Sequence, residues 1–356
     1  MAVSPRPGVL MLGRVHHAKA EFGKLSEVAD VTVRSEAPQR PTPPEADPCS
    51  NSPRAPGMTL FATAMRASTA MSSPSRGPQI TGRFDAELIS HLPPSVRFIS
   101  HNGAGYDQID IEPCNRRNIS VSNTPTAVDA ATANTALFLI LGALRRAWIP
   151  QEAIRAGKWR KGTTLGRDPD DLTLGILGMG GIGTATAKRA AAFGFKLQYH
   201  NRTPVANLDE QFRGQSVPRY VSFDQLLRTS DVISVHLPLG PATQGLIGAE
   251  QLNMMKDGVI IVNTARGAII DEAALVGSLE SGKVWSVGLD VFEKEPAVHP
   301  GLLKHPGAVL LPHVGTATVD TQRRMEALVI DNVRSAITKG RLVTQVDEQK
   351  PTVAKL

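Results

Sequence analysis

A glycine-rich turn between a strand and a helix limits the possible folds of this chain more than any other feature. Leu174–Leu177 reads as a short buried strand, and it leads through Gly178-Met-Gly180-Gly-Ile-Gly183 into a helical segment from Thr184. A G-x-G-x-x-G pattern in this position predicts a dinucleotide-binding βαβ unit. Gly178 permits the tight turn, Gly180 lets the backbone approach a pyrophosphate, and Gly183 lets the helix pack closely on the strand. A glycine-rich connection that binds no ligand is the alternative.

The first helical turn and the next strand predict how a dinucleotide would be bound. Backbone N–H groups near Gly181 and Ile182 face a phosphate, because the start of a helix leaves them without intrahelical partners. An NAD site has an acid about 20 residues after the glycines. Here the chain reads Gln198-Tyr-His-Asn-Arg202-Thr, and the next acid is Asp209. The fork of Arg202 suits a 2′-phosphate, so NADP(H) is favoured and NAD(H) remains possible.

The surrounding pattern predicts an α/β chain with two domains. A length of 356 residues exceeds what a single core usually supports. Short β-rich runs alternate with helical segments, which predicts a parallel sheet covered on both faces. The expected strands of this doubly wound domain lie at 174–177, 196–199, 231–236, 259–263, 284–289 and 308–311. A smaller α/β domain is expected around it, with strands at 8–12, 30–34 and 96–100. Asp129 is expected to cap a long apolar helix that runs to about Arg145.

Composition excludes several classes of protein. The net charge is +6, but Lys and Arg are scattered without a basic run, which argues against nucleic-acid binding. No apolar run reaches membrane-helix length, and the N-terminus lacks the apolar block of a secretory signal. Cys49 and Cys114 are the only cysteines, so neither a disulfide framework nor a Cys-rich metal site is expected. An intracellular protein without a bound metal is therefore expected.

One segment departs from the regular pattern. Residues 37–78 contain nine prolines and show little alternation or helical periodicity. Proline removes ladder donors and breaks helices, so we expect this stretch to be irregular.

Three further motifs lie at expected strand ends, where an open α/β sheet binds its ligands. They are Val262-Asn-Thr-Ala-Arg-Gly267, Gly288-Leu-Asp-Val-Phe-Glu-Lys-Glu-Pro296 and Leu311-Pro-His-Val-Gly-Thr316. With the glycine turn, they resemble the D-isomer-specific 2-hydroxyacid dehydrogenases over about residues 80–345. The resemblance implies two Rossmann-like domains, of which residues 125–317 bind the cofactor. Residues 1–124 and 318–356 would form a smaller, flavodoxin-like substrate domain.

The same motifs supply the groups that reduction of a 2-keto acid requires. Arg266 is the expected carboxylate clamp, since its two donors match a carboxylate. His313 is the expected general acid, because imidazole titrates near working pH. Glu295 is the expected partner of His313; Glu293 competes for this role, but the family spacing places the acid directly before Pro296. Each residue could instead have no catalytic role: Arg266 could be a strand-end charge, Glu295 a solvated loop acid and His313 a helix cap.

The resemblance also implies the binding residues. In the smaller domain, His101-Asn-Gly-Ala-Gly-Tyr-Asp107 resembles the substrate loop, with the backbone N–H groups of Gly103, Ala104 and Gly105 on the substrate carboxylate. A simple glycine turn is the alternative. Asp290 would orient the nicotinamide rather than transfer protons. The full set of implied cofactor contacts is Gly178, Gly180, Gly181, Ile182, Gly183, Asn201, Arg202, Thr203, Pro238, Thr264, Ala265, Asp290 and Gly315.

Within the family, the chain is most similar to the fungal glyoxylate/hydroxypyruvate reductases and the D-mandelate dehydrogenase-like group. Relatives carry a helix and a strand where this chain has residues 37–78, so part of the smaller sheet is expected to be missing; a misread exon is one explanation. Glu295 argues against a formate dehydrogenase. The expected activity is reduction of glyoxylate or hydroxypyruvate, and a dinucleotide-binding corepressor without turnover is the alternative. A homodimer is expected, in the cytoplasm or, through Ala354-Lys355-Leu356, in peroxisomes.

Overall fold

The computed structural model describes residues 6–34, 59–63 and 82–350. Its chain divides into two compact units, residues 1–127 with 317–356 and residues 128–316. The expected cofactor domain was 125–317. The expected peroxisomal tripeptide and most of the proline-rich segment lie outside the described residues. No helix in the described ranges is long and apolar enough to cross a membrane.

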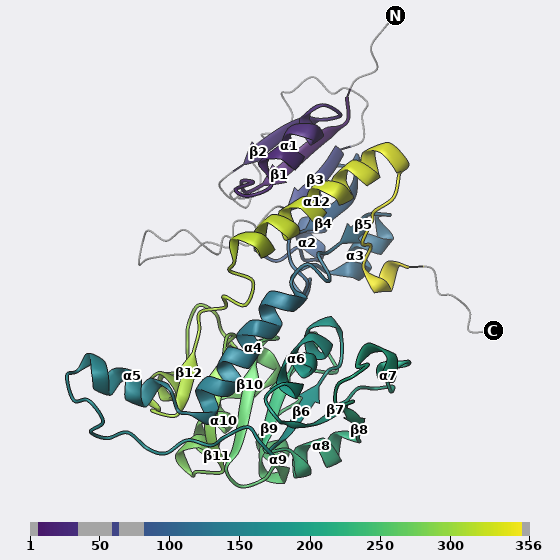
Figure 1. The fold of residues 1–356 in the computed structure, drawn as a ribbon. Helices are drawn as coiled ribbons and strands as arrows, with labels where there is room; N and C mark the ends of the chain where they lie inside the picture. The colour runs from purple at the N-terminus through teal and green to yellow at the C-terminus, as the bar shows by residue number, and fades with distance from the viewer. Residues whose placement is uncertain (1–5, 35–58, 64–81, 351–356) are drawn as a thin grey trace, which may run out of the picture. The chain divides into compact units, whose positions relative to one another are not determined.

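The first unit is built on a parallel five-stranded sheet in the order β2-β1-β3-β4-β5 (Figure 1). This 2-1-3-4-5 order is that of the flavodoxin-like fold, which confirms the predicted class. Apolar side chains of β1 and helix α12 meet in its core, among them Met11 and Val333, both fully buried. The strands are β1 (Gly8–Leu12), β2 (Asp30–Arg34), β3 (Thr59–Thr63), β4 (Val96–His101) and β5 (Ser120–Ser122). The helices are α1 (Lys19–Ser26), α2 (Ala86–His91), α3 (Ile111–Arg116), α12 (Val319–Lys339) and the 3-10 turn η2 (Asp347–Gln349).

The prediction of an incomplete sheet in this unit is wrong. Strand β3, Thr59–Thr63, lies inside the segment expected to be irregular and pairs in parallel with both β1 and β4. Its sequence, Thr-Leu-Phe-Ala-Thr, contains no proline and is rich in residues that favour strands. The prolines on either side of this short run concealed it, because they dominate any window longer than the strand itself.

The second unit is a parallel seven-stranded sheet in the order β12-β11-β10-β9-β6-β7-β8 (Figure 1). When the strands are numbered within the unit and the sheet is read from β8, the order is 3-2-1-4-5-6-7. The first six positions have the order of a doubly wound dinucleotide-binding sheet. The strands are β6 (Thr173–Leu177), β7 (Lys196–His200), β8 (Arg219–Tyr220), β9 (Val232–Val235), β10 (Val259–Asn263), β11 (Val284–Leu289) and β12 (Ala308–Leu310). The helices are α4 (Asp129–Leu144), α5 (Trp148–Arg155), α6 (Gly181–Ala191), α7 (Leu208–Gln211), α8 (Phe223–Thr229), α9 (Ala249–Met254), α10 (Glu272–Glu280), α11 (Pro300–Lys304) and the 3-10 turn η1 (Gly267–Ile269).

Both faces of this sheet are covered by helices, which explains why its central strands β9 and β10 are buried along their whole length. On one face Ile233 and Ile261 pack in a core with Leu275 of α10. On the other face Ile176 and Val262 share a core with α4. Helix α4 begins at Asp129, but its N-cap is Val128, so the predicted capping by Asp129 is wrong.

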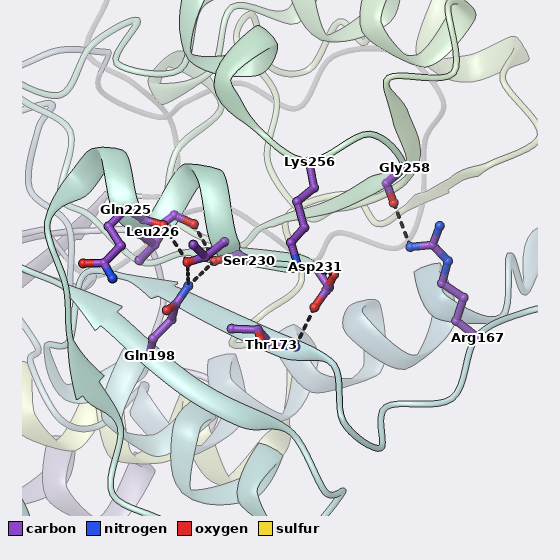
Figure 2. Close-up of polar contacts among 10 residues, drawn as sticks. Arg167, Thr173, Gln198, Gln225, Leu226, Ser230, Asp231, Lys256 and Gly258 are labelled. Atoms are coloured by element: carbon purple, nitrogen blue, oxygen red, sulfur yellow. Dashed lines mark hydrogen bonds and ion pairs between the residues drawn. The ribbon is translucent and has the colours of Figure 1, made fainter.

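Polar side chains fix the amino-terminal edge of the second sheet (Figure 2). Gln198 of β7 donates to the hydroxyls of Thr229 and Ser230, at 2.8 and 2.9 Å. Asp231 accepts a hydrogen bond from the backbone N–H of Thr173 and pairs with Lys256, both at 2.8 Å. These contacts connect neighbouring strands at the edge opposite to the one where ligands bind, and so stabilise the frame on which the site is built.

Candidate active site

The glycine turn between β6 and α6 has the backbone form that its sequence predicts. Gly178 has φ +101°, where an L side chain is strained, and a Cβ there would come within 2.9 Å of the His236 carbonyl. A Cβ on Gly183 would collide with the carbonyl of Gly178. Gly180 is the extended N-cap of α6, and nothing lies within 4 Å of where its Cβ would stand. The turn is therefore closely packed against the protein at Gly178 and Gly183 and open at Gly180, as an approaching pyrophosphate requires.

The residues around the turn fit a nicotinamide dinucleotide. The amides of the first α6 turn, from Gly181 to Gly183, have no intrahelical acceptors because of their position. Thr264, at the end of β10, has a buried hydroxyl with no hydrogen-bond partner among the described residues. A ligand that reaches this strand edge would satisfy that hydroxyl.

The end of β7 carries the residues expected at the ribose of the adenosine half. Arg202 and Thr203 are both exposed there. Asn201 also contacts the glycine turn, because its Oδ1 accepts the backbone N–H of Met179 at 2.7 Å. Asn201 therefore holds the glycine turn in shape. Pro238, expected at the cofactor after β9, is exposed, and its carbonyl accepts from the Thr243 hydroxyl at 2.6 Å.

Arg266 stands in a turn after β10 that a buried asparagine shapes. Asn263 accepts the N–H of Ala265 and donates to the carbonyl of Arg266, both at 2.9 Å. Gly267 follows, and a Cβ there would fall on the carbonyl group of Phe292. The guanidinium itself donates to the carbonyl of Ala265 at 2.8 Å. Asn263 was not singled out from the sequence, although an asparagine at a strand end is a known turn signal.

His313 and Glu295 lie together in the second unit. His313 Nδ1 is 2.8 Å from Glu295 Oε2, and Glu295 Oε1 accepts the N–H of Phe292 at 3.1 Å. Four-fifths of the His313 side chain is buried, since its exposed fraction is 19%. The acid that contacts His313 is thus Glu295 and not Glu293. The backbone N–H of Glu293 donates to Glu272 Oε1 at 2.6 Å. The imidazole is thereby oriented by a carboxylate at one nitrogen, the arrangement of a general acid–base group.

Asp290 holds the turn that carries His313. Its two carboxylate oxygens accept the N–H groups of Val314 and Gly315, at 2.7 and 2.8 Å. Burial raises the pKa of Asp290, and the two N–H bonds oppose that effect. His313 has φ +57°, an unfavourable value for a non-glycine residue, and such strain persists only where neighbours impose it. Asp290 supplies this constraint, a role that the sequence reasoning did not assign.

Asp129 is a second residue near the cofactor turn whose place was not foreseen. Its carboxylate occupies the space where a Cβ on Gly181 would stand. Burial raises the pKa of Asp129. The sequence analysis predicted only a capping role for Asp129, because a separation of about 50 residues does not show that it lies near the glycine turn.

The predicted substrate loop belongs to the first unit. Gly103, Ala104 and Gly105 follow β4, and their backbone N–H groups donate to no acceptor in the described parts of the chain. Their carbonyls, in contrast, are all engaged by protein groups. In the described ranges there is no group of three or more His, Cys, Asp or Glu side chains that could hold a metal ion.

Comparison with known proteins identifies the family. The profile of "D-isomer specific 2-hydroxyacid dehydrogenase, NAD binding domain" matches residues 137–315. The chain is 48% identical over 344 residues to 4-methyl-2-oxopentanoate reductase A of Aspergillus oryzae, covering 97% of this chain and 99% of that one. A crystal structure of a glyoxylate reductase from Paecilomyes thermophila superposes with a TM-score of 0.83 at 47% identity, covering 97% of this chain and all of that one.

A third similarity concerns the cofactor. The NADPH-dependent glyoxylate/hydroxypyruvate reductase of Sinorhizobium meliloti, solved with NADP and malonate, superposes with a TM-score of 0.77 at 30% identity. The alignment covers 96% of this chain and 97% of that one. These similarities favour an enzyme over a corepressor without turnover. The chain belongs to the D-isomer-specific 2-hydroxyacid dehydrogenases, which are NAD(P)-dependent oxidoreductases.

Proposed function

We propose that this protein reduces a small 2-keto acid to the D-2-hydroxy acid, with His313 as proton donor and Arg266 as carboxylate clamp. The observation that carries the proposal is the 2.8 Å contact between His313 and Glu295, next to the strand end that bears Arg266. When bound, NAD(P)H supplies the hydride that reaches the carbonyl carbon. His313 donates a proton to the carbonyl oxygen as charge develops there. Glu295 holds the imidazole in place.

Each unit carries donors that suit an anionic substrate. Arg266 offers two parallel donors, which match the two oxygens of a carboxylate. The backbone amides of Gly103, Ala104 and Gly105 supply further donors for an anion. The overall charge of +6 favours the approach of an anionic substrate.

NADP(H) is the proposed preference between the two nicotinamide dinucleotides. No acid stands at the end of β7 to hold both ribose hydroxyls; that position reads His200-Asn-Arg202-Thr. The exposed guanidinium of Arg202 suits a 2′-phosphate. The Sinorhizobium structure, solved with NADP, supports this preference.

Glyoxylate and hydroxypyruvate are the proposed substrates. Similarity to glyoxylate reductases, including the Paecilomyes structure, supports them. The 48% identity to the Aspergillus enzyme favours a second candidate, the branched 4-methyl-2-oxopentanoate. These acids differ in side-chain size, so their relative kcat/KM values would distinguish a narrow pocket from a wide one.

A homodimer is the proposed assembly. Among the exposed large apolar side chains of the second unit, five lie between residues 138 and 165: Phe138 on α4, Trp148 and Ile154 on α5, and Trp159 and Leu165 in the segment that follows. A second copy would cover such a surface. Light scattering on the purified protein tests this, and an L165D variant is expected to shift the mass toward that of a monomer.

The decisive experiment follows NADPH oxidation by absorbance with glyoxylate, hydroxypyruvate, 4-methyl-2-oxopentanoate and phenylglyoxylate, and repeats each with NADH. Turnover that is faster with NADPH and is abolished in His313→Ala supports the proposal. A folded protein that binds NADPH and reduces none of these acids would contradict it, and would favour a dinucleotide-dependent binding protein instead.

A further inference from the structure

Gly103, Ala104 and Gly105 of the substrate loop are held through their carbonyl groups. Gly103 O accepts the N–H of Thr124 at 2.9 Å, and Ala104 O accepts Asn123 Nδ2 at 2.7 Å. Gly105 O lies 3.1 Å from His101 Nε2. The N–H groups of the same residues donate to no acceptor in the described parts of the chain, so they can bind a ligand. The contacts to the carbonyls therefore set the direction in which the proposed substrate donors point.

Asn123 connects this loop to the segment that follows α12. The Asn123 carbonyl accepts the Thr344 hydroxyl at 2.6 Å, and the Asn123 N–H donates to Thr344 O at 3.3 Å. Ser122, one residue earlier, forms an antiparallel bridge with Gln345. The Val346 N–H donates to Val121 O at 3.0 Å. The chain after α12 thus runs along the edge of β5 and reaches the base of the loop.

Thr344 is fixed in turn by a fully buried asparagine of α12. Asn332 Nδ2 donates to the Thr344 hydroxyl at 2.9 Å. Asn332 Oδ1 accepts the N–H groups of Val343 and Thr344, at 2.9 and 3.0 Å. The Thr344 hydroxyl accepts one bond and donates the next, so a continuous series joins Asn332, Thr344 and the backbone carbonyl of Asn123, whose side chain in turn holds Ala104. Each bond in such a series polarises the next.

A second hydrogen bond connects the same loop to this segment. The Tyr106 hydroxyl donates to Glu348 Oε2 at 2.6 Å. Burial, and then the hydrogen bond to Glu348, raises the pKa of Tyr106, so the phenol keeps its proton and remains a donor. Glu348 belongs to η2, the 3-10 turn at the end of the same segment.

We propose that residues 342–349 form a positioning element for the substrate loop, with Asn332, Thr344 and Asn123 as positioning residues. This inference rests on the proposed function, since it gives a role to the loop that would bind the keto acid. The element sets the orientation of the loop amides and hence the KM for the keto acid. It has no role in binding the dinucleotide, whose expected contacts all lie in the second unit.

The test replaces Thr344 by valine, which keeps the shape and removes the hydroxyl that joins the two asparagines. KM for the keto acid is expected to rise about five- to tenfold, the effect of losing one to two hydrogen bonds. The Kd for NADPH is expected to stay within about twofold of the wild type. Thr344→Ser keeps the hydroxyl and is expected to restore KM.

Thr338→Val is the matched control. Thr338 is exposed on α12, and its hydroxyl donates only to the carbonyl of Arg334 in the same helix. A KM for Thr344→Val that equals that of Thr338→Val would overturn the proposal, as would an equal loss in NADPH affinity. If Thr344→Val does not fold, Tyr106→Phe tests the second hydrogen bond, and an unchanged KM in that variant would likewise overturn the proposal.

Hydrogen exchange separates this proposal from the proposed function. Exchange at the Thr124 amide, which donates to Gly103, is expected to be faster in Thr344→Val than in Thr338→Val. This readout requires no turnover. Wild-type protein without activity would therefore contradict the reductase assignment, whereas unchanged exchange at Thr124 would contradict the positioning element.

Discussion

His313 Nδ1 lies 2.8 Å from Glu295 Oε2, and the second oxygen of that carboxylate accepts the N–H of Phe292. The backbone thus holds one oxygen of Glu295, and the other oxygen orients the imidazole. His313 Nε2 is the nitrogen that we propose serves the substrate oxygen. The pair therefore selects both the tautomer and the direction of the ring.

Replacing Glu295 by glutamine is expected to lower kcat by about 10²-fold, within the range of general acid–base contributions. Glutamine keeps the size and one acceptor but removes the negative charge beside the imidazole. NADPH affinity, measured by fluorescence titration, is expected to remain unchanged. Glu293→Gln is the matched control, because its side chain is two residues away in the same loop and exposed. Equal losses of kcat in both variants would contradict the pairing of Glu295 with His313.

Replacing Asp290 by alanine is expected to reduce both stability and kcat. The N–H groups of Val314 and Gly315 would lose their acceptors, and each unsatisfied buried donor costs about 1–3 kcal/mol. The turn that holds His313 at positive φ would also relax. Urea denaturation and steady-state kinetics measure the two effects. Asp271→Ala, which removes an N-cap acceptor on α10, is the stability control: it is expected to cost about 1 kcal/mol without a loss of kcat.

Most of the fold could be predicted from the sequence, because local signals and tertiary structure agree. The strands at β1, β2, β10 and β11 have the expected bounds, since apolar runs between glycines or polar turns mark them clearly. The short edge strand β8, Arg219–Tyr220, carries no apolar run and was not predicted. Strand β3 was missed because prolines surround it in the sequence, whereas its pairing with β1 and β4 depends on distant residues.

The site was predictable as a set of residue types but not as a set of contacts. Arg266, Glu295 and His313 follow from the chemistry of keto-acid reduction and from motif spacing. The role of Asp290 could not be read in the same way, because its carboxylate accepts backbone N–H groups of another loop. Contacts of this kind depend on the path of the backbone, which no side-chain pattern records.

Arg202→Ala is expected to raise KM for NADPH about 10- to 100-fold and to change KM for NADH by less than about twofold. A guanidinium–phosphate pair is a strong charge-assisted contact, and only NADPH carries the 2′-phosphate. Arg213→Ala is the control, since Arg213 is also exposed and lies beyond α7. Parallel changes in the two KM values for Arg202→Ala would contradict the assignment of Arg202 to the 2′-phosphate.

His236 is expected to make the protein less stable as the pH falls. Burial lowers the pKa of His236 to about 3, from 6.5 in the unfolded chain, and its Nδ1 is enclosed without a partner in the described structure. Below pH 6.5 the unfolded chain binds a proton that the folded chain does not, so stability is full above pH 6.5 and declines as the pH falls toward 3. Between pH 7.5 and 5.5 this group alone removes about 1.4 kcal/mol of unfolding free energy.

Urea denaturation at these two pH values checks this expectation in the wild type and in His236→Gln. Glutamine does not titrate, so the variant is expected to lose about 1.4 kcal/mol less than the wild type between pH 7.5 and 5.5. Its absolute stability at pH 7.5 is expected to be lower, because the hydrogen bond between His236 Nε2 and the Ser234 hydroxyl is lost. His91→Gln, an exposed site on α2, is the control and should keep the wild-type pH dependence. If His236→Gln and the wild type decline equally with pH, the imidazole of His236 is not the group that makes stability sensitive to acid.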